Sequence, residues 1–89
     1  MPIRIEAFYA PGCQKCVQAR AALRGVAEAF GAERVDWRDV DVLAETDHAV
    51  DLGVLSPPAI AIDGELVFPA IPTAARFREE LLRRLAHST

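Results

Sequence analysis

Cys13 and Cys16 are the only two cysteines of this 89-residue chain, and they stand close together in the segment APGCQKC. Cysteines at this spacing can bind a metal, form a structural disulfide or pass electrons through a reversible disulfide. In a reducing compartment, paired cysteines more often serve redox catalysis or metal binding than a purely structural disulfide. The position of the two sulfur atoms in the fold decides between these uses.

The cysteine segment lies between an expected strand and an expected helix. Residues Ile3–Tyr9 begin with alternating apolar and charged side chains, which is typical of a strand. Pro11 and Gly12 end this strand. Residues Cys13–Phe30 then repeat apolar side chains every three or four positions, which predicts an amphipathic helix. Its inward stripe is expected to comprise Cys16, Ala19, Leu23, Val26 and Phe30, and the residues away from that stripe are Gln18, Arg20, Arg24 and Glu28.

The start of this helix gives the two thiols different expected properties. Cys13 lies at the N-cap or in the first turn, where the helix N-terminus and Lys15 favour a thiolate and bring its pKa from about 8.5 toward neutrality. Cys16 heads the inward stripe and should be shielded, which favours its thiol form. An exposed thiolate beside a protected thiol suits thiol–disulfide exchange. We therefore expect Cys13 to attack and Cys16 to resolve, with Gln14 on the exposed rim.

The middle of the chain predicts a strand and a short helix. Residues Val35–Val42 favour a strand, and their charged side chains place it at a sheet edge, where charge discourages unwanted pairing. Residues Ala44–Leu52 are expected to form a short helix that Gly53 stops.

The last part of the chain predicts a hairpin and a final helix. Residues Ala59–Ile62 and Leu66–Phe68 flank Asp63-Gly64, a strong hairpin signal. Thr73 can cap a helix whose apolar residues recur at intervals of four, namely Phe77, Leu81 and Leu85. The order β-α-β-α-β-β-α predicts an α/β fold with a mixed four-stranded sheet and helices on both faces. The first crossover should be right-handed.

Length, charge and hydropathy limit the number of domains, the classes of partner and the location that we expect for this protein. The length predicts one domain over residues 1–89. A net charge of −3 gives no electrostatic reason to expect nucleic acid or an anionic membrane as a partner. No apolar run approaches the roughly 18 residues that span a bilayer, and the first residues lack the pattern of a secretory signal. We expect a cytoplasmic monomer.

A strand, the segment APGCQKC, a helix and a later proline before AIAIDGELVF together resemble the thioredoxin-like superfamily over nearly the whole chain. The short layout is similar to glutaredoxins and to the small, glutaredoxin-sized thioredoxins. The resemblance implies a thiol–disulfide oxidoreductase that requires no organic cofactor and no metal. It implies a disulfide-containing protein or a small thiol as substrate, and a disulfide reductase or a glutathione-type reductant to restore the dithiol.

The resemblance also implies which residues surround the cysteines. In this family a cis proline packs beside the active-site sulfurs, and the matching residue here is Pro58, with a cis Ser56–Pro57 bond as the alternative. The segment Ser56, Pro57 and Pro58 is therefore expected to dock the substrate. The expected neighbours of the cysteines are Gly12, Gln14, Lys15 and Tyr9.

Three features depart from the family's pattern. Ala7 stands where thioredoxins have a buried aspartate that assists proton transfer at the resolving thiol, so its side chain cannot act as a base. The segments SPP and FPAIPT differ from the Thr-Val-Pro and Gly-Gly segments with which glutaredoxins hold glutathione. Pro57 precedes the expected cis proline and has no N–H to offer to a substrate backbone. Losing that hydrogen bond should weaken docking by up to about tenfold.

The competing interpretation is a binding protein. It would be a carrier of Cu(I) or zinc, or a redox-sensing interaction module without turnover. Zinc sites usually have four Cys or His ligands, and beyond the pair only His48 and His87 are available, neither with the spacing of a zinc finger. A Cu(I) site with two thiolate ligands remains an alternative, because soft thiolates suit Cu(I). Such carriers, however, usually end in a strand, whereas this chain is expected to end in a helix. We expect no metal site, with His48 on a helix surface and Trp37 as a packing residue.

Overall fold

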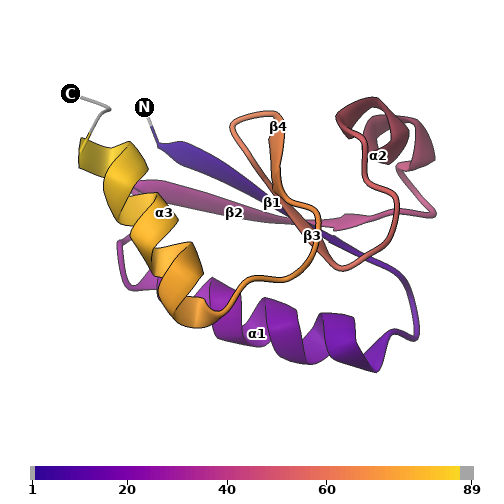
Figure 1. The fold of residues 1–89 in the computed structure, drawn as a ribbon, viewed down its shortest axis with the longest axis horizontal. Helices are drawn as coiled ribbons and strands as arrows, with labels where there is room; N and C mark the ends of the chain where they lie inside the picture. The colour runs from indigo at the N-terminus through magenta and orange to yellow at the C-terminus, as the bar shows by residue number, and fades with distance from the viewer. Residues whose placement is uncertain (1, 87–89) are drawn as a thin grey trace.

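The computed structural model describes residues 2–86 of the chain, and His87 lies outside the described residues. The elements follow the predicted order, and their bounds differ from the predicted ones by at most two residues at either end. They are β1 (Ile3–Tyr9), α1 (Gln14–Glu28), β2 (Val35–Asp41), α2 (Thr46–Leu52), β3 (Ala59–Ile62), β4 (Glu65–Phe68) and α3 (Ala74–Ala86) (Figure 1).

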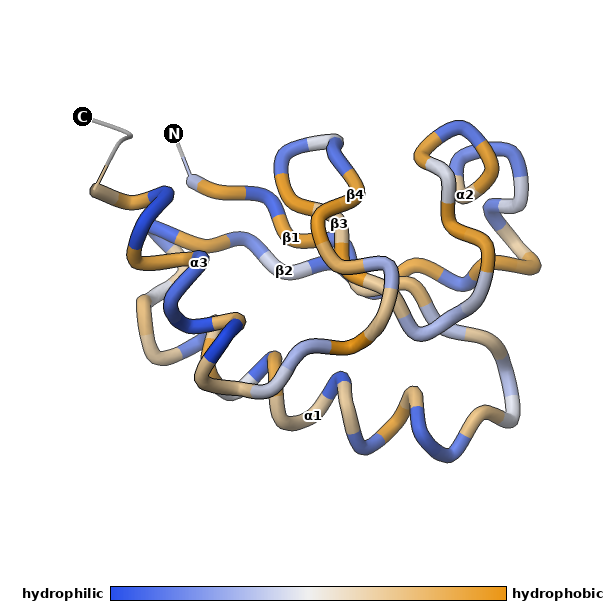
Figure 2. Tube along the Cα trace, viewed as in Figure 1, coloured by the Kyte–Doolittle hydropathy of each residue, from blue (hydrophilic) through white to orange (hydrophobic). Residues whose placement is uncertain are grey.

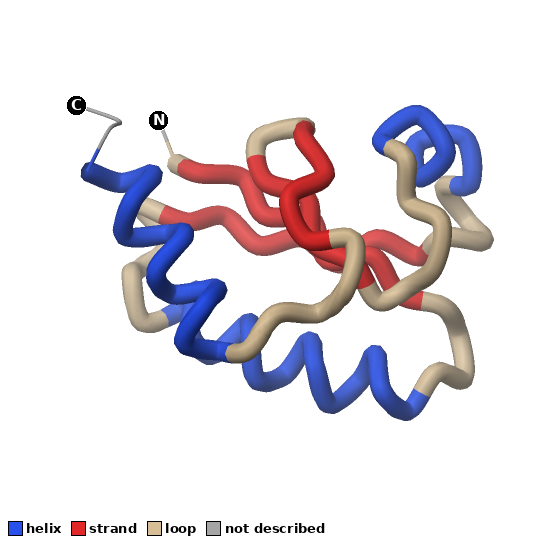
Figure 3. The backbone as a smooth tube through the Cα atoms, viewed as in Figure 1, coloured by secondary structure: helices blue, strands red, loops and turns tan. Residues whose placement is uncertain are grey.

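The four strands form one mixed sheet in the order β2-β1-β3-β4 (Figure 3). Strand β1 pairs with β2 in parallel and with β3 antiparallel, and β3 pairs with β4 antiparallel. The prediction that the charged segment would be an edge strand is confirmed, because β2 has only one neighbour. Strand β1 is central and ends at Tyr9, so the chain leaves the middle of the sheet just before the cysteines.

Helices cover both faces of the sheet, as predicted. Helices α1 and α3 lie on one face and α2 on the other (Figure 1). In Figure 2 the orange of hydrophobic residues is strong on β3 and β4, whereas the edge strand β2 is largely blue and pale, in keeping with its charged residues. Under α1 and α3 the buried core comprises Ile3, Ile5, Ala7, Leu23, Ala27, Val35, Ile60, Ile62, Phe68, Phe77 and Leu81. Under α2 it comprises Phe8, Val40, Ala49, Ala59 and Ala61.

The predicted hairpin turn is present between β3 and β4. Asp63 and Gly64 have φ angles of 51° and 81°, the left-handed region that Asp tolerates and Gly adopts freely. The N–H of Asp63 donates to the carbonyl of Arg4 at 2.8 Å, and the N–H of Arg4 donates to the Asp63 carboxylate at 2.9 Å. The turn is therefore attached to β1 as well as to its own two strands.

Helix α3 begins and packs as its sequence predicts. The N–H of Arg76 donates to the Thr73 hydroxyl at 3.1 Å, so Thr73 caps the helix. Phe77 is buried, with its ring centroid 6.2 Å from that of Trp37 in an edge-to-face arrangement. Trp37 is therefore a packing residue at the base of α3. No helix within residues 2–86 is long and apolar enough to cross a membrane.

Candidate active site

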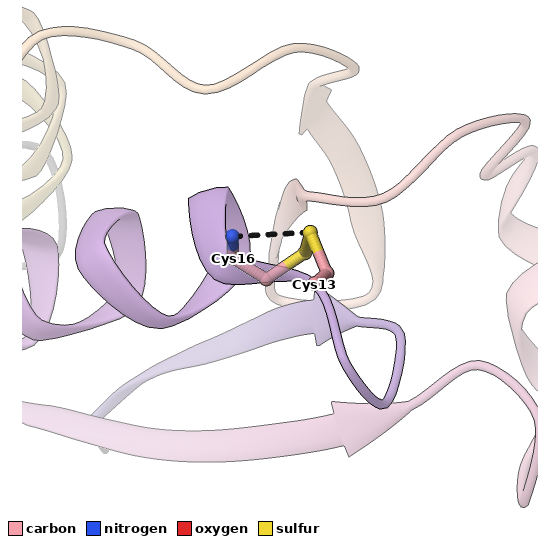
Figure 4. Close-up of a disulfide and its surroundings, with 2 residues drawn as sticks. All are labelled: Cys13 and Cys16. Atoms are coloured by element: carbon pink, nitrogen blue, oxygen red, sulfur yellow. Dashed lines mark hydrogen bonds between the residues drawn. A yellow bond between two sulfur atoms is a disulfide. The ribbon is translucent and has the colours of Figure 1, made fainter.

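The two cysteines form a disulfide at the start of α1, with their Cα atoms 5.2 Å apart (Figure 4). Cys13 is the N-cap residue, with an extended backbone (φ −83°, ψ 106°). Gly12, immediately before it, has a φ of 81°, a conformation that L side chains rarely adopt. The N–H of Cys13 donates to the carbonyl of Ala10 at 3.2 Å and closes the turn out of β1. This turn places the first sulfur at the helix end.

The surroundings of the two sulfurs differ as predicted. Cys16 is 0% exposed, whereas Cys13 is only half-buried. The backbone N–H of Cys16 donates to Cys13 Sγ at 3.2 Å (Figure 4). The first turn of α1 contains no acidic residue that would oppose a negative charge at this end. After reduction, the same N–H would face a thiolate, and a hydrogen bond to an ionised acceptor is stronger than one to a neutral acceptor.

A groove of about 440 Å³ is lined both by the predicted docking segment and by Lys15 of the cysteine segment. Lys15 lines it, whereas Gln14 is exposed and does not. The Pro57–Pro58 peptide bond is cis, the isomer that the family resemblance implies. The wall residues are Lys15, Ala19, Ser56, Pro57, Pro58, Pro69, Ala70 and Ile71.

Sequence reasoning missed one wall of the groove. The prediction for the segment FPAIPT noted only that it lacks Gly-Gly, but Pro69, Ala70 and Ile71 face the groove. Its two prolines were the available signal, because they interrupt regular pairing after β4 and direct the chain back toward α1. Ala19, predicted on the inward stripe of α1, also lines this groove, and Ala27 is buried in the core instead.

Ala7 is buried on the face of the sheet that α1 covers. In the parallel pairing of β1 and β2, its partner is Asp39. The Asp39 carboxylate accepts a hydrogen bond from Trp37 Nε1 at 2.9 Å and lies 3.5 Å from the Arg20 guanidinium and 3.7 Å from that of Arg24. A charged group is therefore present beside Ala7 in the sheet, on the neighbouring strand.

The expectation that Arg20 lies away from the inward stripe is wrong. Its side chain is only 23% exposed, against 54% for Arg24, and its guanidinium lies 4.1 Å from the ring centroid of Tyr9. The reason is geometric, because a residue four positions after Cys16 lies on the same side of a helix as Cys16. Asp39 and Tyr9 then supply partners that α1 alone does not reveal. The available signal was the spacing of Asp39, which shares the alternation of Val35 and Trp37 in β2.

His48 lies on the surface of α2, with a side chain 38% exposed, as predicted, but it also contacts the sheet. Its Nε2 lies 2.6 Å from the Glu6 carboxylate, which also accepts from Arg38 at 3.2 Å. This contact joins α2 to β1 on the face opposite α1, and the His48 ring centroid lies 5.8 Å from that of Phe8. The side chain of His48 is thus occupied in attaching α2. Within residues 2–86, no group of three or more His, Cys, Asp or Glu side chains is arranged to hold a metal.

Comparisons with known proteins agree with one another. Residues 1–82 match a family model described as thioredoxin domain. A protein named "Probable Thioredoxin" from Methanothermobacter marburgensis is 31% identical over 86 residues, which cover 97% of this chain and 95% of that protein. Thioredoxin 1 from Thermosipho africanus has a TM-score of 0.78 at 19% identity, covering 96% of this chain and 97% of its own. A protein disulfide oxidoreductase from Aeropyrum pernix has a TM-score of 0.74 at 28% identity, covering 90% of this chain and 36% of its own.

Proposed function

The chain belongs to the thioredoxin domain family, and we propose that Cys13 is its attacking thiol and Cys16 its resolving thiol. The protein is a thiol–disulfide oxidoreductase that acts on disulfide substrates and is reduced by a reductase. The alternative of a metal carrier is not favoured, because the relatives are named as thioredoxins and disulfide oxidoreductases. The assignment of roles rests on one observation, the complete burial of Cys16 beneath a half-buried Cys13 that accepts its N–H.

The proposed cycle begins with the reduced pair. The Cys13 thiolate attacks one sulfur of the substrate disulfide, the substrate S–S bond breaks, and the second substrate sulfur leaves as a thiolate that takes up a proton. Cys16 then attacks Cys13 Sγ, the mixed disulfide breaks, and the first substrate sulfur leaves carrying the proton that Cys16 lost, directly or through water. The two electrons of the dithiol have passed to the substrate, and the Cys13–Cys16 disulfide remains for a reductase.

Ala7 bears on the second step of this cycle. Its methyl group cannot accept a proton, and it is buried in the apolar core below α1. Deprotonation of Cys16 is therefore expected to rely on the departing substrate sulfur or on water rather than on a side chain at this position. The N–H of Cys16 and the free amides at the start of α1 instead favour negative charge on Cys13, so they assist the first step.

Trapping of the mixed disulfide tests the assignment of roles. Cys16→Ser should still be attacked by substrate but cannot resolve, so it should accumulate a covalent adduct with a protein disulfide such as insulin. Cys13→Ser is the matched control and should form at most about a tenth as much adduct, because the remaining thiol is fully buried. Equal adduct yields from the two variants, or a higher yield from Cys13→Ser, would refute the assignment.

The segment Ser56, Pro57 and Pro58 is proposed as the docking site for the substrate backbone. It is supported by the groove, in which this segment faces Lys15. Gly12 would shape the turn that presents Cys13, Tyr9 would support that turn from the end of β1, and Gln14 would lie at the rim. Since Pro57 has no N–H, one backbone hydrogen bond to an extended substrate cannot form.

Restoring that N–H tests the docking proposal. Pro57→Thr should lower KM for a peptide disulfide by up to about tenfold, the value of one net hydrogen bond. Pro69→Thr is the control, because it changes another proline of the same wall without adding a donor next to Pro58. An unchanged KM in Pro57→Thr would contradict the proposal, and so would an equal decrease in both variants.

The same groove supports a proposal for the electron donor. Its proline-rich wall offers few N–H groups to hold the carboxylates of glutathione, which favours a disulfide reductase as the donor. We place this cycle in the cytoplasm, because a reducing compartment is needed to regenerate the dithiol. Turnover that depends on a reductase and does not respond to glutathione is the expected result, and the reverse dependence would overturn the choice of donor.

A further inference from the structure

The interface between α1 and the sheet holds a cation, Arg20, whose side chain is only 23% exposed. The Arg20 guanidinium lies between the Tyr9 ring at 4.1 Å and the Asp39 carboxylate at 3.5 Å, and its Nε is buried without a hydrogen-bond partner. A buried donor without a partner is costly, so the arrangement of Arg20 is not explained by its own hydrogen bonding. This cation has no part in the proposed thiol chemistry.

Arg20 and Tyr9 lie on the two elements that flank the cysteine segment, and Asp39 lies on the strand that pairs with β1. Arg20 follows Cys16 by one helical turn on the same side of α1, where side chains four positions apart are neighbours. Tyr9 ends β1, directly before the turn that presents Cys13. Asp39 pairs in the sheet with Ala7, the residue of β1 that lies in the core below α1. The two charges of the Arg20–Asp39 pair thus lie at a partly shielded interface, with side chains 23% and 33% exposed, where charges interact more strongly than in bulk water.

The other charged groups at this end of α1 and β2 are more exposed or otherwise engaged. Lys15 is exposed at the groove, and the Arg24 side chain is 54% exposed and binds Glu28 at 2.9 Å. The Asp41 carboxylate accepts the N–H of Leu43 at 2.8 Å at the end of β2. Arg20, with a side chain 23% exposed, is therefore the most shielded cation among these, and the Asp39 side chain, 33% exposed, is its partner across the interface.

We propose that the Arg20–Asp39 pair sets the reduction potential of the Cys13–Cys16 couple, with the two charges acting in opposite directions. This inference rests on the proposed dithiol chemistry of the two cysteines. The reduced protein carries negative charge on Cys13 and the oxidised protein does not. Arg20 stabilises that charge and thus the reduced form, while Asp39 opposes it. Both residues act as positioning and field-setting groups, and neither exchanges atoms with the substrate.

Equilibration with dithiothreitol measures the effect without requiring turnover of a protein substrate. In that exchange, protein disulfide and reduced dithiothreitol give protein dithiol and the cyclic disulfide of dithiothreitol, so electrons and protons balance. At neutral pH, Arg20→Met should lower the equilibrium constant toward the dithiol by about threefold, since the cation is lost and its apolar stem is kept. Asp39→Asn should raise it by about threefold. A threefold change corresponds to about 14 mV for a two-electron couple.

The opposite signs separate an electrostatic role from a structural one. Both single variants break the same ion pair, so a merely structural role would move the equilibrium constant in the same direction in both, or leave it unchanged. The double variant Arg20→Met with Asp39→Asn should return within about 1.5-fold of wild type, although its thermal stability stays lower. Arg20→Lys keeps the cation, so its equilibrium constant should also stay within about 1.5-fold of wild type.

Arg24→Met is the matched control. It removes the same formal charge from the same helix and also a partner of Asp39, but from an exposed side chain, so solvent and salt screen its effect to under about 1.5-fold. Shifts of the same sign in Arg20→Met and Asp39→Asn, or no shift in either, would overturn the inference. If the wild-type disulfide does not equilibrate with dithiothreitol at all, the proposed function itself fails. If it equilibrates but the two variants do not shift in opposite directions, only the inference fails.

Discussion

Each face of the sheet carries a charged contact between a helix and a strand, and the two contacts differ in what surrounds them. On the face of α1, Arg20 meets Asp39 of β2 one helical turn after Cys16. On the face of α2, His48 meets Glu6 of β1 at 2.6 Å. The first contact is made by α1, the helix that begins at the cysteine pair. The second contact joins β1 to a helix that contributes no residue to the disulfide or to the groove. The comparison separates charges that can tune the chemistry from charges that only attach a helix.

The apolar cores on the two faces of the sheet also differ, in the size of their buried side chains. Under α1 and α3 the core is built from large side chains such as Leu23, Phe77 and Leu81, whereas three of the five buried residues under α2 are alanines. Free energy from apolar burial rises with the area removed from water, so the helix that carries the cysteines is held on the more stable face. The seven-residue α2 is held by less apolar area and by its polar contact with Glu6.

The largest expected effect tests this difference in packing. Leu81→Ala on α3 should lower the free energy of unfolding by about 2–5 kcal/mol, because the side chain is 0% exposed and leaves a cavity. Leu52→Ala on α2 should cost only about 1 kcal/mol, since that side chain is half-buried. Leu82→Ala, at the neighbouring and 48% exposed position, is the control and should cost less than about 1 kcal/mol. Equal losses in urea unfolding for Leu81→Ala and Leu52→Ala would contradict the comparison.

A second prediction concerns the contact between α2 and β1. Glu6→Gln should lower the free energy of unfolding by about 1 kcal/mol, because the carboxylate that binds both His48 and Arg38 becomes a neutral amide. The equilibrium constant with dithiothreitol should stay within about 1.5-fold of wild type. A shift as large as that expected for Arg20→Met would show that both faces influence the couple, and the distinction between them would fail.

The smallest effect is expected at Glu80 on α3, which takes part in neither contact. Partial burial raises the pKa of Glu80, but hydrogen bonds from Arg84 and Arg83 outweigh this and hold the pKa below its usual value of 4.5. Because the folded state binds fewer protons than the unfolded state below that value, the contribution to stability is present above it and is lost as pH falls through the folded pKa.

Glu80→Gln should therefore reduce stability at neutral pH by less than about 1 kcal/mol and make no difference once Glu80 is protonated. Thermal unfolding followed from neutral to acidic pH measures this, with Glu79→Gln as the exposed control on the same helix. A deficit in Glu80→Gln that persists unchanged in acid would show that the loss does not come from its charge.

The parts of the fold that follow local rules were predictable from the sequence. The turn at Asp63-Gly64, the cap at Thr73 and the change of period at the cysteines each depend on a few adjacent residues, and each prediction is confirmed. The placement of Cys13 and Cys16 at a helix start belongs to the same class, since Gly12 and the onset of the apolar stripe mark it. Family resemblance added the importance of Pro58, which spacing alone does not indicate.

The side-chain contacts between distant segments were not predictable, although the mixed sheet and its charged edge strand were. Arg20 lies on the flank of α1, and whether a flank residue meets solvent or sheet depends on which strand lies beside it. That strand is β2, whose parallel register brings Asp39 next to Ala7. His48 and Glu6 are 42 positions apart in the chain, so their contact requires the path of α2 across the sheet. The wall at Pro69–Ile71 likewise depends on the path of a loop.

The different roles of the two cysteines are the central claim, and the alkylation rates of the reduced protein test it most directly. Reduced protein is treated briefly with iodoacetamide at neutral pH, and mass spectrometry of the peptides gives the rate at each cysteine. Cys13 should react at least about tenfold faster than Cys16, because its thiolate is favoured and Cys16 is fully buried. Equal rates, or faster labelling of Cys16, would contradict the account.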